Sequence, residues 1–257
     1  MQYKNVITTK EDYKILKEAT AISVKILKEL RDSVEIGVTA KFIDDLALEL
    51  CGKYGVEPAF NGVEGILAPF SGNICISTNN EILHTIPSVK RVFKNGDIVK
   101  LDFGIVHKGY YTDHCVTVGL GRLSKDEEAL IKTAKLCIDT ALKNAVTGKT
   151  IGDISSVMQN ICELSGFDFV TTYCGHGIGK SLHLAPEIPS YGEPGEGEKL
   201  VEGMVLCIEN QITIGKADLR LSPDGWTLKT IDGSKGAMFE HMVIVREGKP
   251  EVLTLMD

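Results

Sequence analysis

Apolar residues recur at helical spacing in the first part of the chain, between Thr9 and Val34. They form one stripe at intervals of three or four residues: Ile15, Ala19, Ile22, Ile26 and Leu30. Thr9 and Asp12 resemble a capping box at the start of this segment. The pattern therefore predicts a helix over 9–34, and a similar pattern predicts a second helix that runs from Thr39 to Cys51.

A second pair of helices is predicted further on, one from Ser124 with Glu127 in its capping box and one from Thr150 with Asp153. The second helix of the first pair resembles the second helix of the second pair, and the matching residues are separated by a constant number of positions. Gly37, Thr39, Ile43, Cys51 and Gly55 recur as Gly148, Thr150, Ile154, Cys162 and Gly166. The recurrence indicates an internal duplication. Two amphipathic helices with similar caps can also look alike by chance.

Short apolar segments that end in an acid support the duplication. The segments 96–102 and 203–209 share the pattern Gly-x-apolar-apolar-x-apolar-acid and end in Asp102 and Glu209. Each half is then expected to be a helix pair followed by strands. Glu209 is expected to end its strand, and Glu240 to open another.

The segment 100–118 predicts a β-hairpin, with Lys108-Gly109 as the turn signal. Such a hairpin brings Asp102 and Asp113 beside one another, although the register stays open because Gly109 can be a bulge. Two adjacent carboxylates repel unless a cation lies between them or one is protonated. The alternative is an acid pair on a solvent-facing hairpin.

Composition and charge limit the kind of protein. The chain has 257 residues, 43% of them hydrophobic and 25% charged, with a net charge of −7. No Lys/Arg-rich run is present, which argues against nucleic acid as a main partner. No segment has the length or pattern of a membrane span or a signal sequence, and the seven scattered cysteines are typical of reduced thiols in a cytoplasm. A single domain over 1–257 is expected, since no linker composition interrupts it.

Four acids and one histidine stand out as candidate metal ligands: Asp102, Asp113, His176, Glu209 and Glu240. The acids adjoin apolar runs, where an ionised carboxylate must be paired, protonated or bound to a metal. The neighbouring residues offer few Lys or Arg partners, although each acid alone could be a salt-bridged core residue. Four carboxylates exceed the charge of one dication, so two ions are expected. Oxygen-rich ligands favour Mn, Fe(II), Co or Zn.

Histidines provide the remaining candidates. His176 lies between glycines in Gly175–Gly179, and His183 follows seven residues later. His84 precedes Thr85-Ile-Pro. A lone histidine is more often a core or surface residue than a ligand, and the glycine-rich setting favours function for His176 and His183. A two-metal site activates water and polarises a carbonyl or phosphoryl oxygen, which indicates hydrolysis of an amide or phosphate ester and leaves the substrate open.

The order of these residues resembles methionine aminopeptidases of the short bacterial type I. The resemblance rests on His84, Asp102, Asp113, Gly175-His-Gly-Ile-Gly179, His183-x-x-Pro186, Glu209, Asp224-Gly-Trp-Thr227 and Glu240-His241. The interval between Glu209 and Glu240 is too short for the helical insert of type II enzymes. No N-terminal zinc-finger or docking extension is expected.

The resemblance implies an α+β pita-bread fold, with two pseudo-symmetric halves of helix pair and strands around a curved antiparallel β-sheet. It implies an enzyme that removes initiator methionine from nascent proteins and peptides, favouring small second residues. The expected partners are nascent N-termini at the ribosome, with no direct contact to nucleic acid or membrane. A cytoplasmic monomer is expected.

The resemblance also implies roles for the site residues. Asp102 would bind one metal, Asp113 and Glu240 would bridge both, and His176 and Glu209 would complete the second. A hydroxide held by both metals would attack the first peptide carbonyl, with Glu209 handling the proton. His183 would stabilise the oxyanion, and His84 would contact the scissile nitrogen.

The pocket for the methionine side chain is expected to include Leu67, Phe70, Cys75, Leu182 and Trp226, although core packing explains each of these residues about as well. The chain departs from the family pattern beside the ligands rather than at them. The departures are Thr85, Leu182, Asn210, Met238 and Met242. Two alternatives stay open: a related pita-bread Xaa-Pro peptidase, and a catalytically inactive binding homologue.

Overall fold

Side-chain caps start the helices where the sequence predicts them. The computed structural model describes residues 4–256. In α1 (Lys10–Asp32) the Thr9 side chain accepts a hydrogen bond from the third amide of the helix. In α2 (Ala40–Tyr54) Thr39 does the same, and the helix ends at Gly55 with a left-handed φ of 67°.

The second helix pair has complete capping boxes. α3 (Lys125–Ala141) is capped by Ser124 and Glu127, and it continues into the short 3-10 turn η1 (Leu142–Asn144). α4 (Ile151–Leu164) is capped by Thr150 and Asp153. All four predicted helices are present. α1 and α2 match their predicted bounds to within three residues, and α3 and α4 begin within one residue of the predicted starts.

A 9-stranded sheet forms the centre of the molecule, in the order β10-β9-β11-β14-β7-β4-β2, with β8 paired to β11 and β15 to β14. Every pairing in it is antiparallel. The strands are β2 (Cys75–Thr78), β4 (Ile98–Phe103), β7 (His114–Gly119), β8 (Asp168–Phe169), β9 (Gly175–Gly177), β10 (Leu184–Ile188), β11 (Val205–Thr213), β14 (Gly236–Ile244) and β15 (Glu251–Val252).

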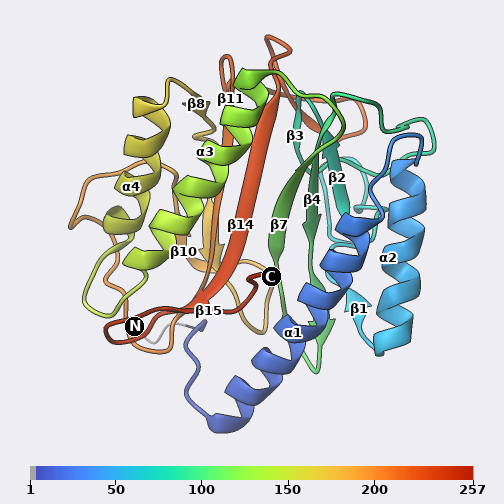
Figure 1. The fold of residues 1–257 in the computed structure, drawn as a ribbon. Helices are drawn as coiled ribbons and strands as arrows, with labels where there is room; N and C mark the ends of the chain where they lie inside the picture. Colours follow the sequence, from blue (N-terminus) through green and yellow to red (C-terminus); the bar gives the residue numbers. More distant parts are fainter. Residues whose placement is uncertain (1–3, 257) are drawn as a thin grey trace.

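The order of the strands confirms the two related halves. β2, β4 and β7 follow one another on one side, and β9, β11 and β14 on the other, so that β7 and β14 meet at a central seam. The two segments with the shared glycine-to-acid pattern are β4 and β11, which occupy equivalent places on either side of the seam. Each half also supplies one helix pair (Figure 1).

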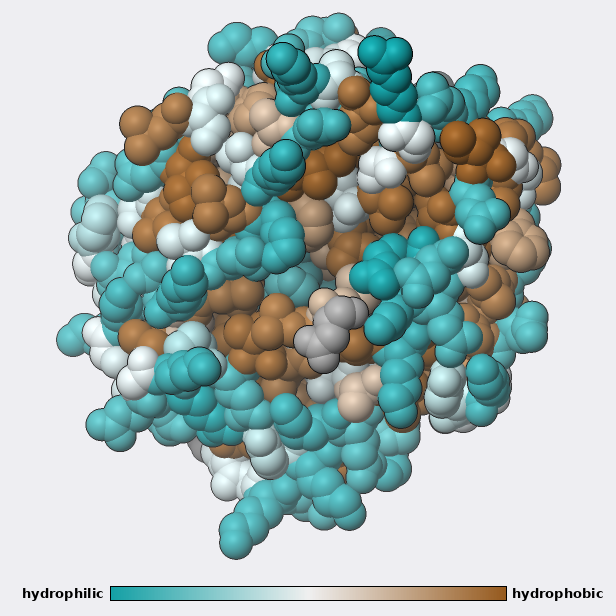
Figure 2. All heavy atoms as spheres, in the orientation of Figure 1, coloured by the Kyte–Doolittle hydropathy of each residue, from teal (hydrophilic) through white to brown (hydrophobic). Residues whose placement is uncertain are grey.

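The helices cover one face of this sheet, and α1 and α3 cross in front of it in Figure 1. The main hydrophobic core lies between the two layers and joins residues of all four helices to alternate residues of the strands. Leu206 and Ile208 of β11 belong to this core, whereas Cys207 and Val205 belong to a cluster on the opposite face. Figure 2 shows the helical face, where hydrophilic side chains predominate with apolar groups between them.

The predicted hairpin is confirmed and consists of two stacked ladders. β4 pairs with β7, and beyond Gly104 the chain continues as β5 (Ile105–His107) and β6 (Tyr110–Tyr111), with Lys108 and Gly109 at the turn in left-handed conformations. A Cβ at Gly104 would lie 2.1 Å from the Thr112 carbonyl oxygen, so only glycine fits this close approach.

Two small sheets flank the large one. β1 (Glu57–Pro58) joins β5 and β6, and β3 (Glu81–Leu83) joins β13 (Leu228–Thr230) and β12 (Leu219–Leu221). Among the described residues, no helix combines the length and the apolar character that crossing a membrane requires.

Candidate metal centre

Three acids lie in one row across the centre of the large sheet. Asp102 on β4 is opposite Cys115 on β7, Cys115 is opposite Glu240 on β14, and Glu240 is opposite Glu209 on β11. Residues directly opposite one another in antiparallel strands share a face, so the acids all lie on the face away from the helices. The row crosses the seam between the two halves.

The positions of Glu209 and Glu240 within their strands differ from the prediction. Glu209 does not end its strand and Glu240 does not open one, because each lies at the middle of a 9-residue strand that continues on both sides. The strand β11 runs on through the polar residues Asn210 and Gln211, which are buried and hydrogen bonded. Asn210 donates to the Ala134 carbonyl of α3 at 2.9 Å, and Gln211 donates to the Glu209 carboxylate.

Asp113 and His176 lie beside this row, on the same side of it. Asp113 is two residues from Cys115, and His176 is opposite Cys207, two residues from Glu209. Asp113 immediately precedes β7, and its Oδ2 lies 3.8 Å from His176 Nε2. The other ring nitrogen of His176, Nδ1, is 2.9 Å from the Gly177 carbonyl oxygen. That contact fixes the ring orientation and leaves Nε2 directed toward the acids, as in histidines that bind metals.

Burial shifts the acids toward their protonated forms. It raises the pKa of Asp102 to about 7. Burial and the Asp102 charge raise the pKa of Glu209 to about 8, although the Gln211 hydrogen bond opposes the shift. Burial first, and then the neighbouring carboxylates, place the pKa values of Asp113 and Glu240 well above the usual range.

No basic partner compensates these acids. None of the ion pairs within residues 4–256 joins a lysine or arginine to any of the four carboxylates. Asp102 Oδ1 and Asp113 Oδ1 are buried without a hydrogen-bond partner. Buried oxygens in this state are costly unless a cation or proton satisfies them.

The donor atoms are close enough to share ions. Three groups have their ligand atoms within 4.8 Å of one another: Asp102–Asp113–Glu240, Asp113–His176–His183 and His176–Cys207–Glu240. Burial, followed by the neighbouring His183, lowers the pKa of His176 to about 4, so its ring is neutral and able to bind a metal. Glu209 belongs to none of these groups in the described part of the chain, and its carboxylate accepts a hydrogen bond from Gln211. The residues present fit a divalent cation.

His84 and His183 border this centre. His84 has a φ of 52°, an unusual conformation for a non-glycine residue, and its ring meets Tyr173 and Trp226 edge-on at 5.4 and 6.3 Å. Burial, and then His183, lower the pKa of His84 to about 4. The His183 ring lies 4.5 Å from that of His176, and burial lowers its pKa as well.

A cavity of about 290 Å³ opens beside Asp102 and Asp113. Of the residues expected from the sequence, Phe70, Cys75, His84, Leu182, His183 and Trp226 line it. Leu67 does not: its side chain is exposed and packs near Gly225. Phe60, Val63 and Glu64 also line the cavity, and the sequence reasoning missed them because no periodic pattern marks the loop that holds Val63 and Glu64.

A second cavity of about 510 Å³ shares His84 and His183 with the first. It extends over Tyr173, Glu187 and Glu209. The two histidines therefore stand between a small apolar cavity and a larger open one, both beside the acids.

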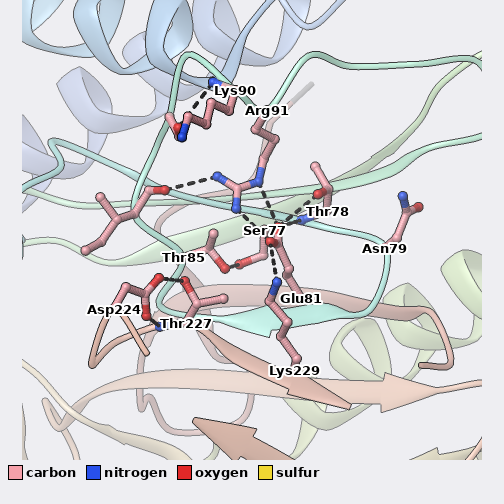
Figure 3. Close-up of polar contacts among 12 residues, drawn as sticks. Ser77, Thr78, Asn79, Glu81, Thr85, Lys90, Arg91, Asp224, Thr227 and Lys229 are labelled. Carbon is pink, nitrogen blue, oxygen red and sulfur yellow. Dashed lines mark hydrogen bonds and ion pairs between the residues drawn. The ribbon is translucent and has the colours of Figure 1, made fainter. Parts of the chain in front are cut away.

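A polar cluster anchors the segment that leads to His84 (Figure 3). Arg91 donates two hydrogen bonds to the Glu81 carboxylate, at 2.8 and 2.6 Å, and Lys229 Nζ lies 3.3 Å from it. Burial raises the pKa of Glu81, but the Arg91 contacts outweigh burial and leave it lowered. The cluster ties β3 to β13, two residues beyond Trp226.

Trp226 is oriented by its own turn. Asp224 accepts hydrogen bonds from the backbone amides of Trp226 and Thr227 at 3.0 and 2.9 Å. Thr227 Oγ1 also donates to Asp224, at 2.6 Å (Figure 3). The indole N–H donates to the Ala68 carbonyl at 2.9 Å. The ring is thereby held against Phe70, with ring centres 5.2 Å apart.

Several departures from the family pattern have structural partners. Thr85 is fully buried and accepts a hydrogen bond from Ser77 at 2.9 Å. Met242 Sδ accepts from the Asp113 amide at 3.4 Å, and Met238 packs in a small cluster with Cys115. These residues therefore pack beside the strands that carry the expected metal ligands.

The model of metallopeptidase family M24 matches residues 14–247. The chain belongs to this family. It is 37% identical to a methionine aminopeptidase of Clostridium acetobutylicum, over 98% of this chain and 99% of the relative. The solved structure of a methionine aminopeptidase from Thermotoga maritima superposes with a TM-score of 0.93 at 35% identity, covering 98% of this chain and 99% of that one.

A prolidase from Pyrococcus furiosus shares the fold alone. Its TM-score is 0.78 at 23% identity, and the match covers 98% of this chain but 66% of the prolidase. The resemblance to methionine aminopeptidases and the α+β pita-bread fold are thus confirmed. The chain is a metallopeptidase, hence a hydrolase of a metal-using family.

Proposed function

We propose that this protein removes the N-terminal methionine from peptides and newly made proteins, favouring small second residues. The observation that carries the proposal is the apolar cavity beside Asp102 and Asp113. At about 290 Å³ it lies near the lower end of ligand pockets, roughly 300–1,000 Å³, so it suits one side chain rather than a large ligand. Aromatic walls from Phe70 and Trp226 offer favourable contacts to a thioether sulfur.

The second cavity supplies the path for the rest of the peptide. The first side chain would enter the apolar cavity, and the following residues would extend past Tyr173 and Glu187. The scissile bond would then lie between His84 and His183, next to the acids.

We propose two divalent ions as cofactors, from among Co, Mn, Fe(II) and Zn, held by Asp102, Asp113, His176, Glu209 and Glu240. Four carboxylates exceed the charge of one dication, and no lysine or arginine within residues 4–256 compensates them, which supports two ions. The unpartnered oxygens of Asp102 and Asp113 offer two of the donor atoms. Bound ions of this kind activate water and polarise the carbonyl of the bond to be cleaved.

The protein's own groups would then direct the proton and the developing charge. Glu209, with its raised pKa, suits the acceptance and return of a proton near neutral pH. His183 would donate a hydrogen bond to the carbonyl oxygen as its negative charge grows. His84, held between Tyr173 and Trp226, would contact the leaving nitrogen.

The partners follow from the substrate. We propose that the protein acts as a monomer in the cytoplasm on nascent polypeptide N-termini at the ribosome. The net charge of −7 supports contact through the peptide rather than through nucleic acid.

The test is cleavage of Met-Ala-Ser by the metal-loaded protein, with Met-Trp-Ser and a dipeptide of the Xaa-Pro type as comparisons. Release of methionine from the first peptide, abolished by a chelator and much slower from the second, is expected. Hydrolysis of the Xaa-Pro dipeptide alone would favour the prolidase activity. Metal binding without hydrolysis of any peptide would favour a binding protein.

A further inference from the structure

A thiol lies among the carboxylates of the candidate centre. Cys207 stands on β11 two residues before Glu209, so both side chains are on the same face of the strand. Its Cα partner on β9 is His176. Neither the hydrolytic roles nor the five expected ligands use this thiol.

The thiol is close enough to its neighbours to bind the same ion. The ligand atoms of His176, Cys207 and Glu240 all lie within 4.8 Å of one another. Cys207 is fully buried. Its Sγ contacts the Asp113 carbonyl oxygen at 3.9 Å and donates a hydrogen bond to the Glu240 carboxylate. One nitrogen, one sulfur and one oxygen donor, each from a different side chain, therefore lie close enough together to share one ion.

Other thiols near the centre lack this arrangement. Cys115, opposite Glu240, directs its Sγ toward the carbonyl oxygens of Val116 and Met238, each at 3.9 Å. Cys174 borders the larger cavity and is partly exposed. Neither belongs to a group of converging ligands among the described residues, so both serve as matched controls.

We propose that Cys207 is a ligand for soft and borderline divalent ions, Cd²⁺ and Zn²⁺, at the position between His176 and Glu240. One imidazole, one thiolate and one carboxylate would form the mixed nitrogen, sulfur and oxygen donor set that zinc-type ions accept. As the metal–sulfur bond forms, the thiol proton leaves to the solvent. The hard ion Mn²⁺ prefers the oxygen donors and does not recruit the sulfur.

This proposal rests on the proposed metal centre, and it adds that the set of ligands differs from one ion to another. With Mn²⁺ the centre is held by acids and imidazole. With Cd²⁺ or Zn²⁺ the sulfur adds a bond, so these ions bind more tightly than the oxygen ligands alone would allow.

The test is titration of the metal-free full chain with Cd²⁺, followed by ultraviolet absorption from thiolate-to-cadmium charge transfer. The wild type should show this absorption and Cys207→Ser should lose it, with Cd²⁺ affinity lowered at least about tenfold, the scale on which partners of metal ligands act. Mn²⁺ affinity should change much less. Cys115→Ser and Cys174→Ser should keep both the absorption and the affinity.

Loss of the absorption in Cys174→Ser or Cys115→Ser, with Cys207→Ser unaffected, would overturn the proposal. Equal losses of Cd²⁺ and Mn²⁺ affinity in Cys207→Ser would overturn it too, since they would show that the substitution disturbs the whole centre rather than removing a sulfur ligand. If Cys207→Ser does not fold, the cadmium-113 NMR shift of the wild type decides, because a sulfur ligand moves it strongly from an all-oxygen and nitrogen value. Cleavage of Met-Ala-Ser with Mn²⁺ tests the proposed function separately from the sulfur contact.

Discussion

Lowering the pH from 7 to 6 should weaken Mn²⁺ binding to the metal-free protein sharply. In the metal-free fold the pKa of Asp102 is about 7 and that of Glu209 about 8, both raised first by burial. Both carboxyls therefore hold protons at pH 6 that an ion must displace. The pKa of His176 is lowered to about 4, so this ring stays neutral and does not compete through the same range.

The size of the effect follows from these values. Between pH 7 and pH 6 the ionised fraction falls about fivefold for Asp102 and about ninefold for Glu209, so affinity falls roughly fiftyfold when both must ionise. At a fixed, saturating Mn²⁺ concentration, the bound ion raises the free energy of unfolding by about 2 kcal/mol less at pH 6 than at pH 7. Asp113 and Glu240, whose pKa values are also raised well above the usual range by burial and the neighbouring carboxylates, act in the same direction.

Calorimetric titration of the metal-free protein with Mn²⁺ at both pH values gives the affinities. Repeating it in two buffers with different ionisation enthalpies counts the protons released. Asp126→Asn, an exposed acid in the first turn of α3, is the control and should match the wild type. An affinity that changes less than twofold between pH 7 and pH 6, with no proton released, would refute the idea that burial keeps these acids protonated.

Four substitutions test the site and its support. Asp102→Asn and Glu240→Gln should abolish methionine release while circular dichroism stays native, and near-normal turnover in either would remove them from the metal set. His183→Ala should lower kcat by about two to three orders of magnitude, as the loss of an oxyanion donor does; an unchanged kcat would exclude that role. Glu81→Gln should lower the free energy of unfolding by about 3 kcal/mol, measured in urea, because Arg91 loses its buried partner; a loss under 0.5 kcal/mol would contradict it.

Local signals in the sequence were sufficient for the helices and the hairpin. A side chain such as Thr39 or Ser124 caps the helix that directly follows it, so the information is contained in a few residues. The duplication was also readable, since β4 and β11 keep the same pattern of glycine, apolar residues and acid.

Features that depend on distant partners were harder to predict. Glu209 looked like a strand end because polar residues follow it, yet Asn210 is satisfied by a carbonyl on α3 that the sequence does not show. Leu67 was expected in the cavity on apolar character alone, whereas the loop turns its side chain outward. The sequence marks Cys207 only as one of seven scattered cysteines, although its spacing from Glu209 already places both on one face of a strand.

A metal ion bound at the seam between β7 and β14 would hold the two halves of the molecule together, because each half supplies some of its ligands. Asp113 comes from one half and Glu240 from the other, while the seven cysteines are all free and provide no covalent link. Because the ion binds only when the two halves bring their ligands together, its binding free energy stabilises the contact between them. A protein cut by a protease in the segment between the halves would therefore stay in one piece while metal is bound, and a chelator would weaken the hold between its two fragments.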